Sequence, residues 1–425
     1  MKKEMLLAVA AMPVLAWTAP VVTDVEMIQT PDREVTINYT LSGEAAVVTF
    51  DIVTNALENG GASVGGRNLW YPSGDVNRLI GRNHDFATPL KCSIKWNPSR
   101  TPLAECGFVA TDGSVKAVVK AWSTNCPPEY MSVRLGGLAS TYRADAEPIT
   151  RFYADKDFVP GGVTDNADYK SSWLLMRKIP AAGIEWRMGS PSTESGRSAA
   201  DEIPRLVKLS ADYYIGVFKV TKQQYYAATN VSSSAETVAD PHTPAVAMKW
   251  NSVRGTSNGS TTDVEPASGS FLASLRQATG VAFDLPTEAQ WEYACRAGTS
   301  GSNYGAGDVY AIAWAGGKSA VTDVGTLLPN NWGLYDMIGN TYEIVLDYYA
   351  NGDALYATFG GKGYADPVEN PAVLNATSTG AKRVRRGACY DEWSSSCRSA
   401  RRRDYGVGDA YVGVGMRLAC PAIVR

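Results

Sequence analysis

The pattern of apolar residues changes along the chain, and this change constrains the fold more than any other feature. Over 35–41 and 48–52 apolar and polar residues alternate, with a turn signal at 42–44. Residues 115–122 and 130–135 are two more strand-like runs. Alternation places every second side chain on one face of a strand. Several short strands with turns between them predict a β-sandwich of immunoglobulin or fibronectin type.

Helix signals appear only in the second part of the chain. Two pairs of residues have the spacing of a capping box: Thr221 with Gln224, and Thr287 with Gln290. In a capping box the first residue is the N-cap, and the second lies three positions later in the first turn of the helix. Gly298 suits the end of the second helix, and aligned apolar residues predict a third helix over about 269–279. Forty glycines indicate long loops between these elements. The fold class predicted for the whole chain is α+β.

The chain has 425 residues, which is too long for one ordinary hydrophobic core. We therefore predict two domains. The expected division is a signal peptide at 1–16, the β-sandwich at 17–140, a linker at 141–172 and a second domain at 173–425. The linker is assigned to a stretch that is rich in Gly, Asp and Pro and has no sustained period.

The overall charge excludes some classes of function. Forty Lys and Arg residues stand against 43 Asp and Glu residues, a net charge of -3, which argues against a protein that lives on nucleic acid or on an anionic membrane. Only two histidines occur, His84 and His242, so a histidine-rich zinc site is not expected.

The N-terminus has the pattern of a secretory signal. Lys2 and Lys3 precede an apolar stretch over 5–17 that is too short for a stable membrane-spanning helix. The alternative is a retained N-terminal anchor. We expect an exported protein, periplasmic, cell-surface or secreted, with no membrane span in the mature chain. Export makes disulfides plausible, although the seven cysteines are an odd number.

Several strings in the second domain resemble one family. Four motifs occur in the family's order, the last of them in three short pieces: 215–225, 285–299, 332–343, and then 385–389, 397–400 and 414–418. They are similar to segments of the sulfatase-modifying-factor family, whose founding members are formylglycine-generating enzymes. The resemblance implies a C-type-lectin-like fold for the second domain.

The resemblance also implies where a copper site would lie. The family's oxidases bind copper through two cysteines near the C-terminus and oxidise a substrate cysteine to formylglycine. The matching positions here are Cys397 for the second cysteine and Glu392 for the first. A carboxylate cannot replace a thiolate as a ligand of Cu(I), so copper is not expected. If the chain is an oxidase, Cys397 and Cys389 carry the activity.

A structural role is the alternative for the cysteines. Cys397 is then a buried thiol, or a disulfide partner of Cys295, and Cys420 could pair with Cys389.

Calcium is the family's other cofactor. Gly339, Asn340, Thr341 and Glu343 supply hard oxygen ligands at close spacing, which suits Ca²⁺. Alternatively, Asn340 and Glu343 satisfy backbone donors in a buried turn.

The segment from Cys389 to Tyr411 has the composition of a recognition surface, because aromatic residues and arginine are mixed with small polar residues. The predicted ligand-binding residues are Tyr390, Asp391, Trp393, Ser394, Ser396, Arg401, Arg403, Asp404, Tyr405, Asp409 and Tyr411. The segment resembles the C-terminal variable region of the variable proteins of diversity-generating retroelements, which share the lectin-like fold. Arginines also cluster around it, and we interpret them as strand residues that pair internally rather than as a nucleic-acid site.

These observations predict an exported protein that uses a lectin-like domain to bind a protein or glycan ligand through a C-terminal surface. The alternative is a formylglycine-generating oxidase that acts on a sulfatase cysteine. A third hypothesis is a structural or regulatory subunit without ligand chemistry of its own.

Overall fold

A computed structural model describes residues 19–54, 61–104, 108–109, 113–135, 149–229, 240–255, 265–305, 307–350, 366–374 and 382–424. The predicted signal peptide at 1–16 and Cys106 lie outside the described residues. Within the described ranges, every helix is too short or too polar to cross a membrane. The chain forms two compact units, one built from residues up to Val64 and from Pro72–Thr124, the other from Gly65–Tyr71 and Asn125–Val424.

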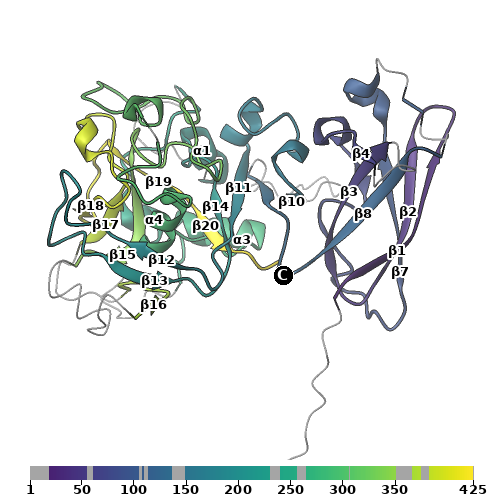
Figure 1. The fold of residues 1–425 in the computed structure, drawn as a ribbon, viewed down its shortest axis with the longest axis horizontal. Coiled ribbons are helices and arrows are strands. Elements are labelled where there is room, and N and C mark those ends of the chain that lie inside the picture. The colour runs from purple at the N-terminus through teal and green to yellow at the C-terminus, as the bar shows by residue number, and fades with distance from the viewer. Residues whose placement is uncertain are drawn as a thin grey trace, which may run out of the picture. The chain divides into compact units, whose positions relative to one another are not determined.

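The N-terminal unit consists of two sheets (Figure 1). The first has the order β1–β2–β7–β5, formed by β1 (Val21–Gln29), β2 (Val35–Ser42), β7 (Leu90–Trp96) and β5 (Ser73–Gly74). The second is centred on β3 (Ala46–Thr54), which pairs with β4 (Ala62–Ser63), β6 (Leu79–Ile80) and β8 (Lys116–Ser123). The predicted strands at 35–41 and 48–52 are present. They lie in different sheets, so the turn between them crosses from one sheet to the other.

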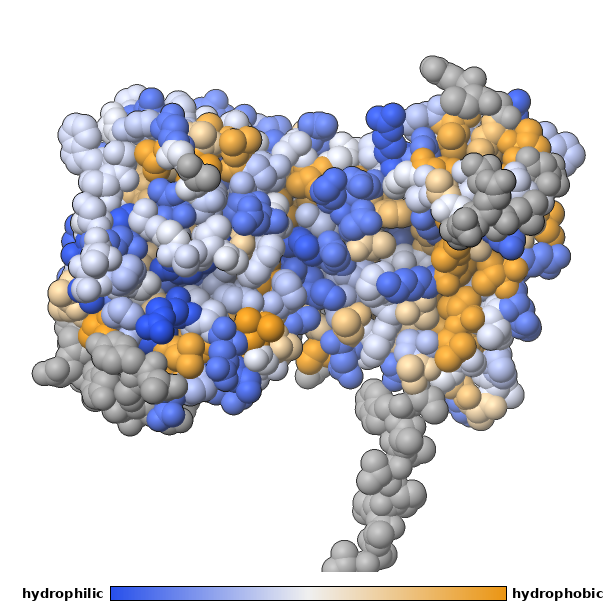
Figure 2. All heavy atoms as spheres, viewed as in Figure 1, coloured by the Kyte–Doolittle hydropathy of each residue, from blue (hydrophilic) through white to orange (hydrophobic). Residues whose placement is uncertain are grey.

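Part of the surface of the N-terminal unit is apolar. Figure 2 shows apolar side chains gathered on this unit, whose exposed large hydrophobic residues include Val21, Val25, Ile28 and Val118. Val25 and Ile28 of β1 line an open hollow of about 500 Å³, together with residues just before and within β8.

The C-terminal unit begins before the predicted boundary. Its five-stranded sheet has the order β10–β9–β11–β14–β20. The strands are β9 (Tyr130–Arg134), β10 (Thr150–Tyr153), β11 (Trp173–Ile179), β14 (Tyr213–Gly216) and β20 (Ala419–Pro421). The segment expected to end the first domain and part of the expected linker therefore belong to this sheet. Pairing with β11 buries β9, which local sequence pattern does not reveal.

Four α-helices are described in the C-terminal unit: α1 (Lys222–Thr229), α2 (Trp250–Val253), α3 (Phe271–Thr279) and α4 (Glu288–Arg296). Both predicted capping boxes are present. The backbone N–H of Gln224 donates to the Thr221 hydroxyl at 3.1 Å, and that of Gln290 donates to the Thr287 hydroxyl at 3.1 Å. The third helix has Ser270 as its N-cap. Helix α4 ends at Arg296, and Ala297 (φ 45°) is its C-cap, so Gly298 (φ 85°) follows the cap at the predicted C′ position.

The remaining elements are short. A three-stranded sheet contains β12 (Glu185–Met188), β13 (Arg205–Lys208) and β16 (Val368–Glu369). Single 3-10 turns are η1 (Gly66–Leu69), η2 (Pro98–Arg100), η3 (Pro102–Ala104), η4 (Lys156–Phe158), η5 (Ala167–Lys170), η6 (Val309–Ala311) and η7 (Ser394–Ser396).

The last sheet positions the candidate site. Its order is β18–β17–β15–β19, from β18 (Arg402–Tyr405), β17 (Arg383–Arg386), β15 (Tyr342–Tyr348) and β19 (Val414–Met416). Helix α4 packs against β15 and β17 (Figure 1). In the β17–β18 pair Arg386 faces Arg402 and Arg385 faces Arg403. Because successive side chains of a strand point to opposite faces, these two arginine pairs lie on opposite sides of the sheet. We call the side that carries Arg386 the inner face and the side that carries Arg385 the outer face.

Candidate functional site

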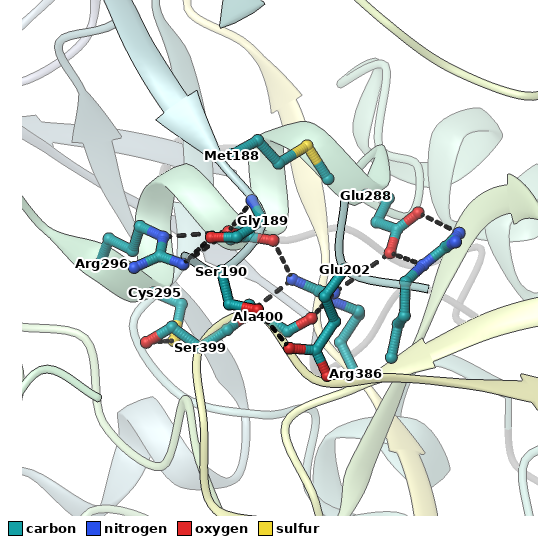
Figure 3. Close-up of polar contacts among 12 residues, drawn as sticks. Met188, Gly189, Ser190, Glu202, Glu288, Cys295, Arg296, Arg386, Ser399 and Ala400 are labelled. Carbon is teal, nitrogen blue, oxygen red and sulfur yellow. Dashed lines mark hydrogen bonds and ion pairs between the residues drawn. The ribbon is translucent and has the colours of Figure 1, made fainter. Parts of the chain in front are cut away.

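Two glutamates of α4 bind the arginines of the inner face. The Arg402 guanidinium makes two bonds of 2.7 Å to the Glu288 carboxylate. Arg386 lies 3.1 Å from Glu288 and also binds Glu292 (Figure 3). All four side chains are almost completely buried. Burial alone would raise the pKa of Glu288, but the charges of Arg402 and Arg386 outweigh it and hold this pKa below its ordinary value.

Other arginines of the predicted basic cluster are also satisfied inside the protein. Arg398 binds Glu194 and Glu202 at 2.7 Å each. The Arg383 guanidinium lies 3.9 Å from the centre of the Trp250 ring and 3.4 Å from that of Tyr348. The prediction that these strand arginines pair internally is therefore correct for most of the cluster.

The carboxylate of Glu343 is held by two cations and an indole. Lys219 Nζ donates to one of its oxygens at 2.6 Å, and Trp291 Nε1 donates to the other at 2.6 Å. Arg417 lies 2.9 Å from the same carboxylate. Burial would raise the pKa of Glu343, and the charges of Arg417 and Lys219 lower it by more. Both oxygens are therefore used within the protein.

The neighbouring residues of the predicted calcium loop are likewise bonded within the chain. The Asn340 side chain donates to the carbonyl of Thr322 at 2.9 Å and accepts from its N–H at 3.1 Å. The Thr341 carbonyl accepts from Lys219 at 2.8 Å, and the Gly339 N–H donates to Gly387 at 2.6 Å.

Calcium would have to compete with the charges of Lys219 and Arg417 for Glu343. The Glu343 and Asn340 side chains are bonded within the protein and do not fit a calcium ion, and the buried Thr341 hydroxyl alone has no hydrogen-bond partner in the described part of the chain. Among the described residues, no group of three or more His, Cys, Asp and Glu side chains could hold a metal ion.

The residues at the two copper positions do not fit Cu(I) either. The Glu392 carboxylate accepts from the Tyr342 hydroxyl and lies 3.6 Å from Arg401. Burial, together with the charge of Glu392, raises the pKa of Cys397 to about 12. Burial also raises the pKa of Cys389, whose thiol donates to Asp391 at 2.9 Å. Burial thus favours the neutral thiol at both positions, and a soft metal would have to displace a proton from each.

Each of the described cysteines is a free thiol: Cys92, Cys126, Cys295, Cys389, Cys397 and Cys420. The thiol of Cys295 donates to the Ser399 hydroxyl at 3.6 Å instead of bonding to Cys397. The buried-thiol alternative therefore holds for Cys397, and neither the Cys295–Cys397 nor the Cys389–Cys420 disulfide is formed.

The predicted ligand-binding residues divide by exposure. Exposed residues are Asp391, Trp393, Arg403, Asp409 and Tyr411, and half-buried residues are Tyr390, Ser394, Ser396, Arg401 and Asp404. We call these ten residues the 390–411 face. Tyr405 is buried, and its hydroxyl donates to the Asp409 carbonyl at 2.6 Å, so it supports the surface from below.

Trp393 is displayed on a fixed loop. Its side chain is 74% exposed. The Ser396 N–H donates to the Trp393 carbonyl at 2.9 Å, and the Gly316 N–H donates to the adjacent Glu392 carbonyl at 2.7 Å. At the other end of the face, the Tyr411 hydroxyl donates to Asp391. Two segments that are distant in sequence are thus joined at the surface.

The outer face of the sheet carries an open hollow of about 420 Å³, lined by Arg385, Asp404, Tyr405, Asp409, Ala410 and Tyr411. Arg385 was grouped in the sequence with the internally paired arginines. Arg385 lies one residue before Arg386 on the strand, so its side chain points to the opposite face of the sheet. The alternation of 383–386 is the signal that could have distinguished the two arginines, once the inner face was known.

The fold and the site define a mixed α/β domain, mostly of sheet, in which buried ion pairs support a loop-built polar surface. Residues 185–422 match the model of the sulfatase-modifying factor enzyme 1-like domain. The match covers more than half of the chain, so the chain belongs to this family.

Individual relatives match parts of the chain. It is 32% identical over 136 residues to serine/threonine-protein kinase pkn1 of Chlamydia pneumoniae, covering 32% of this chain and 20% of the kinase. It is 30% identical over 156 residues to the formylglycine-generating enzyme of Streptomyces coelicolor, covering 32% of this chain and 46% of the enzyme. The chain thus spans less than half the length of these curated relatives.

Among solved structures, Treponema denticola variable protein 1 is similar with a TM-score of 0.44 and 23% identity, covering 59% of this chain and 96% of that chain.

Proposed function

We propose that the chain is an exported ligand-binding protein whose C-type-lectin-like domain binds a protein or glycan through the 390–411 face. The observation that carries this proposal is the 74% exposure of Trp393 on a loop fixed by backbone hydrogen bonds. A large aromatic side chain that is exposed to solvent on a fixed loop is typical of the anchor residues of binding interfaces. In this proposal the N-terminal unit, an immunoglobulin-like sandwich, serves to display the C-terminal domain.

The copper positions favour binding over the oxidase alternative. Glu392 stands where the family's oxidases have their first cysteine, and its carboxylate is engaged by Tyr342 and Arg401. Burial, with the nearby charge of Glu392, raises the pKa of the thiols of Cys389 and Cys397.

Diversification of the 390–411 face belongs to the same proposal. Its Tyr, Asp, Ser and Arg residues fall in the set that mutation at adenines produces in retroelement variable regions. A near-copy of the 3′ end of the gene, with a reverse transcriptase gene beside it, would support diversification, and the lack of both would remove it.

Binding is tested with arrays of purified glycans and exported proteins, followed by affinity measurements on the hits by biolayer interferometry. Trp393→Ala is expected to weaken binding by about tenfold or more, as hot-spot aromatic residues do. Leu328→Ala is the control, because Leu328 is 62% exposed in the same unit and lies outside the face. Equal affinities of wild type and Trp393→Ala for every hit would refute the proposed face.

A further inference from the structure

Arg385 differs from Arg386 and Arg402 because, among the described residues, it forms no ion pair with a carboxylate. Arg386, Arg402 and Arg417 each bind a buried glutamate. The nearby Asp404 is paired with Lys382, whose bond and charge, helped by the charge of Arg385, lower the pKa of Asp404, and the buried Nε of Arg385 has no hydrogen-bond partner within the described ranges. The side chain lines the open hollow of the outer face. A guanidinium group presents five N–H donors, so this residue has unused capacity for an oxyanion.

Tyrosine rings hold the Arg385 guanidinium in place. Its central carbon lies 4.3 Å from the centre of the Tyr342 ring, 5.5 Å from that of Tyr411 and 5.8 Å from that of Tyr405. The hydroxyls of these rings donate to Glu392, Asp391 and the Asp409 carbonyl respectively. Each ring is therefore fixed at both ends, and the cation is positioned before any ligand arrives, which lowers the entropic cost of binding.

A second arginine stands beside the first. Arg403 is the cross-strand neighbour of Arg385 on the outer face, and its side chain is exposed. Like charges placed directly opposite each other in a sheet are destabilising. An oxyanion bound between the two guanidinium groups would remove this repulsion, and it could accept a bidentate hydrogen bond from either group.

The hollow also contains hydrogen-bond acceptors. Asp404 binds Lys382 at 2.5 Å, and Asp409 accepts from the Gly406 N–H at 2.9 Å, which leaves acceptor capacity on both carboxylates. These carboxylates would repel a second negative charge, so a polyanion or a strongly acidic peptide is disfavoured. They suit a ligand that brings hydroxyl donors next to a single negative group. The exposed part of the Tyr411 ring offers an apolar surface beside them.

From these contacts we infer that the hollow binds one acidic sugar residue. Its carboxylate lies between Arg385 and Arg403, its hydroxyls donate to Asp404 and Asp409, and one face of its ring packs on Tyr411. A hollow of about 420 Å³ is large enough for one such residue and lies within the usual size range of small-molecule sites. This inference rests on the proposed function and specifies the ligand group that the 390–411 face recognises.

The test uses the full chain and three soluble probes: methyl β-glucuronide, methyl α-sialoside and the neutral methyl β-glucoside. Dissociation constants are measured by saturation-transfer difference NMR. We expect at least one acidic sugar to bind about tenfold or more tightly than the glucoside, the effect of one charge-assisted hydrogen bond. Arg385→Gln is expected to abolish this preference, and Arg385→Lys to retain part of it because the charge remains without the bidentate geometry.

Arg177→Gln is the matched control. The Arg177 guanidinium also lies over a tyrosine, 5.0 Å from the Tyr130 ring centre, but it has its own carboxylate, Glu129, at 3.1 Å. This variant is expected to bind all three sugars as the wild type does. Equal binding of acidic and neutral sugars, or an unchanged preference in Arg385→Gln, would overturn the inference.

Two further outcomes separate this inference from the proposed function. If glutarate binds as tightly as the acidic sugars, the site recognises any carboxylate and the sugar assignment fails. If an array ligand requires Trp393 but binds Arg385→Gln normally, the 390–411 face stands and the acidic-sugar site does not. Unfolding curves of each variant, recorded by circular dichroism, exclude loss of fold as the cause.

Discussion

Position 392 separates this chain from the copper-binding pattern that its sequence resembles. Glu392 is joined to Tyr342 and Arg401, and the nearby thiol of Cys397 is protonated at neutral pH. We predict that the reduced wild-type protein takes up no stoichiometric Cu(I) in competition with a chromophoric chelator. Glu392→Cys, which supplies a second thiol at the family's position, should gain one equivalent of Cu(I), because two soft ligands can then share the ion.

Leu328→Cys is the control for this experiment, since it adds a thiol at an exposed position outside the 390–411 face. It should not reproduce the copper uptake of Glu392→Cys. Stoichiometric uptake by the wild type, with oxygen-dependent conversion of a cysteine-containing sulfatase peptide, would restore the oxidase hypothesis.

Residue-level prediction from the sequence was uneven. The internal pairing of the strand arginines was predicted, because alternate charged residues in a buried strand need partners. Their glutamates, Glu288 and Glu292, were not, since both lie on a helix whose burial depends on distant strands. Tyr405 and Tyr411 look alike in composition, yet Tyr405 is buried at the end of β18 and Tyr411 is exposed beyond it.

Helix α4 carries both network glutamates, so its N-terminus fixes part of the inner face. The Thr287 hydroxyl accepts from the Gln290 N–H, and the Gln290 side chain returns the bond to the Thr287 N–H at 2.9 Å. We predict that Thr287→Ala lowers the free energy of unfolding of the C-terminal unit by about 1 kcal/mol, the usual loss for an N-cap. Chemical denaturation followed by circular dichroism measures this change.

Thr326→Ala is the matched substitution, because the Thr326 side chain is exposed and lies outside the helices. It should leave the denaturation midpoint almost unchanged. If both variants shift the midpoint equally, the capping box contributes nothing specific to α4.

Elements with local signals were predicted well, and elements defined by pairing were not. Helices α1 and α4 followed from capping residues that lie within one turn of each start, and α3 followed from its aligned apolar residues. The sheet that contains β9 and β10 joins strands to β20, almost 300 positions away in the chain. No local pattern encodes such a partner, so the boundary between the two units was placed too late.

The two units differ in how they use charge. Buried Asp, Glu, Lys and Arg side chains among the described residues all belong to the C-terminal unit, including Glu288, Glu292 and Glu343. The pKa values of these glutamates are held below the ordinary value of 4.5. Each therefore contributes stability that is complete above the unfolded-state pKa and is lost as the pH falls through the lower folded-state pKa.

Asp347 acts in the opposite direction. Burial and the charge of Glu288 raise the pKa of Asp347 from 3.8 to about 6. Its ionised form costs stability above pH 6, and this cost disappears as the pH falls from about 6 toward 3.8. The stability of the C-terminal unit should thus be level or rise slightly from pH 7 to 5, and then fall steeply below 4.5.

Differential scanning calorimetry of the full chain from pH 7 to 3.5 measures this dependence. We expect two transitions, one for each unit, and the transition that Thr287→Ala shifts belongs to the C-terminal unit. That transition should lose several degrees between pH 4.5 and 3.5. The other should move less. Equal shifts of both transitions would contradict the role assigned to the buried glutamates.

The opposite orientation of Arg385 and Arg386 has an evolutionary consequence. These two residues are adjacent in sequence but have separate roles. Arg386 binds buried glutamates of the scaffold, and Arg385 faces the open hollow. Substitutions at outward positions can therefore accumulate one at a time at a smaller cost to folding than substitutions at inward positions. Ligand specificity can then change during evolution while the buried framework is kept. Related chains are therefore expected to differ most at 385 and 403 and least at 386 and 402.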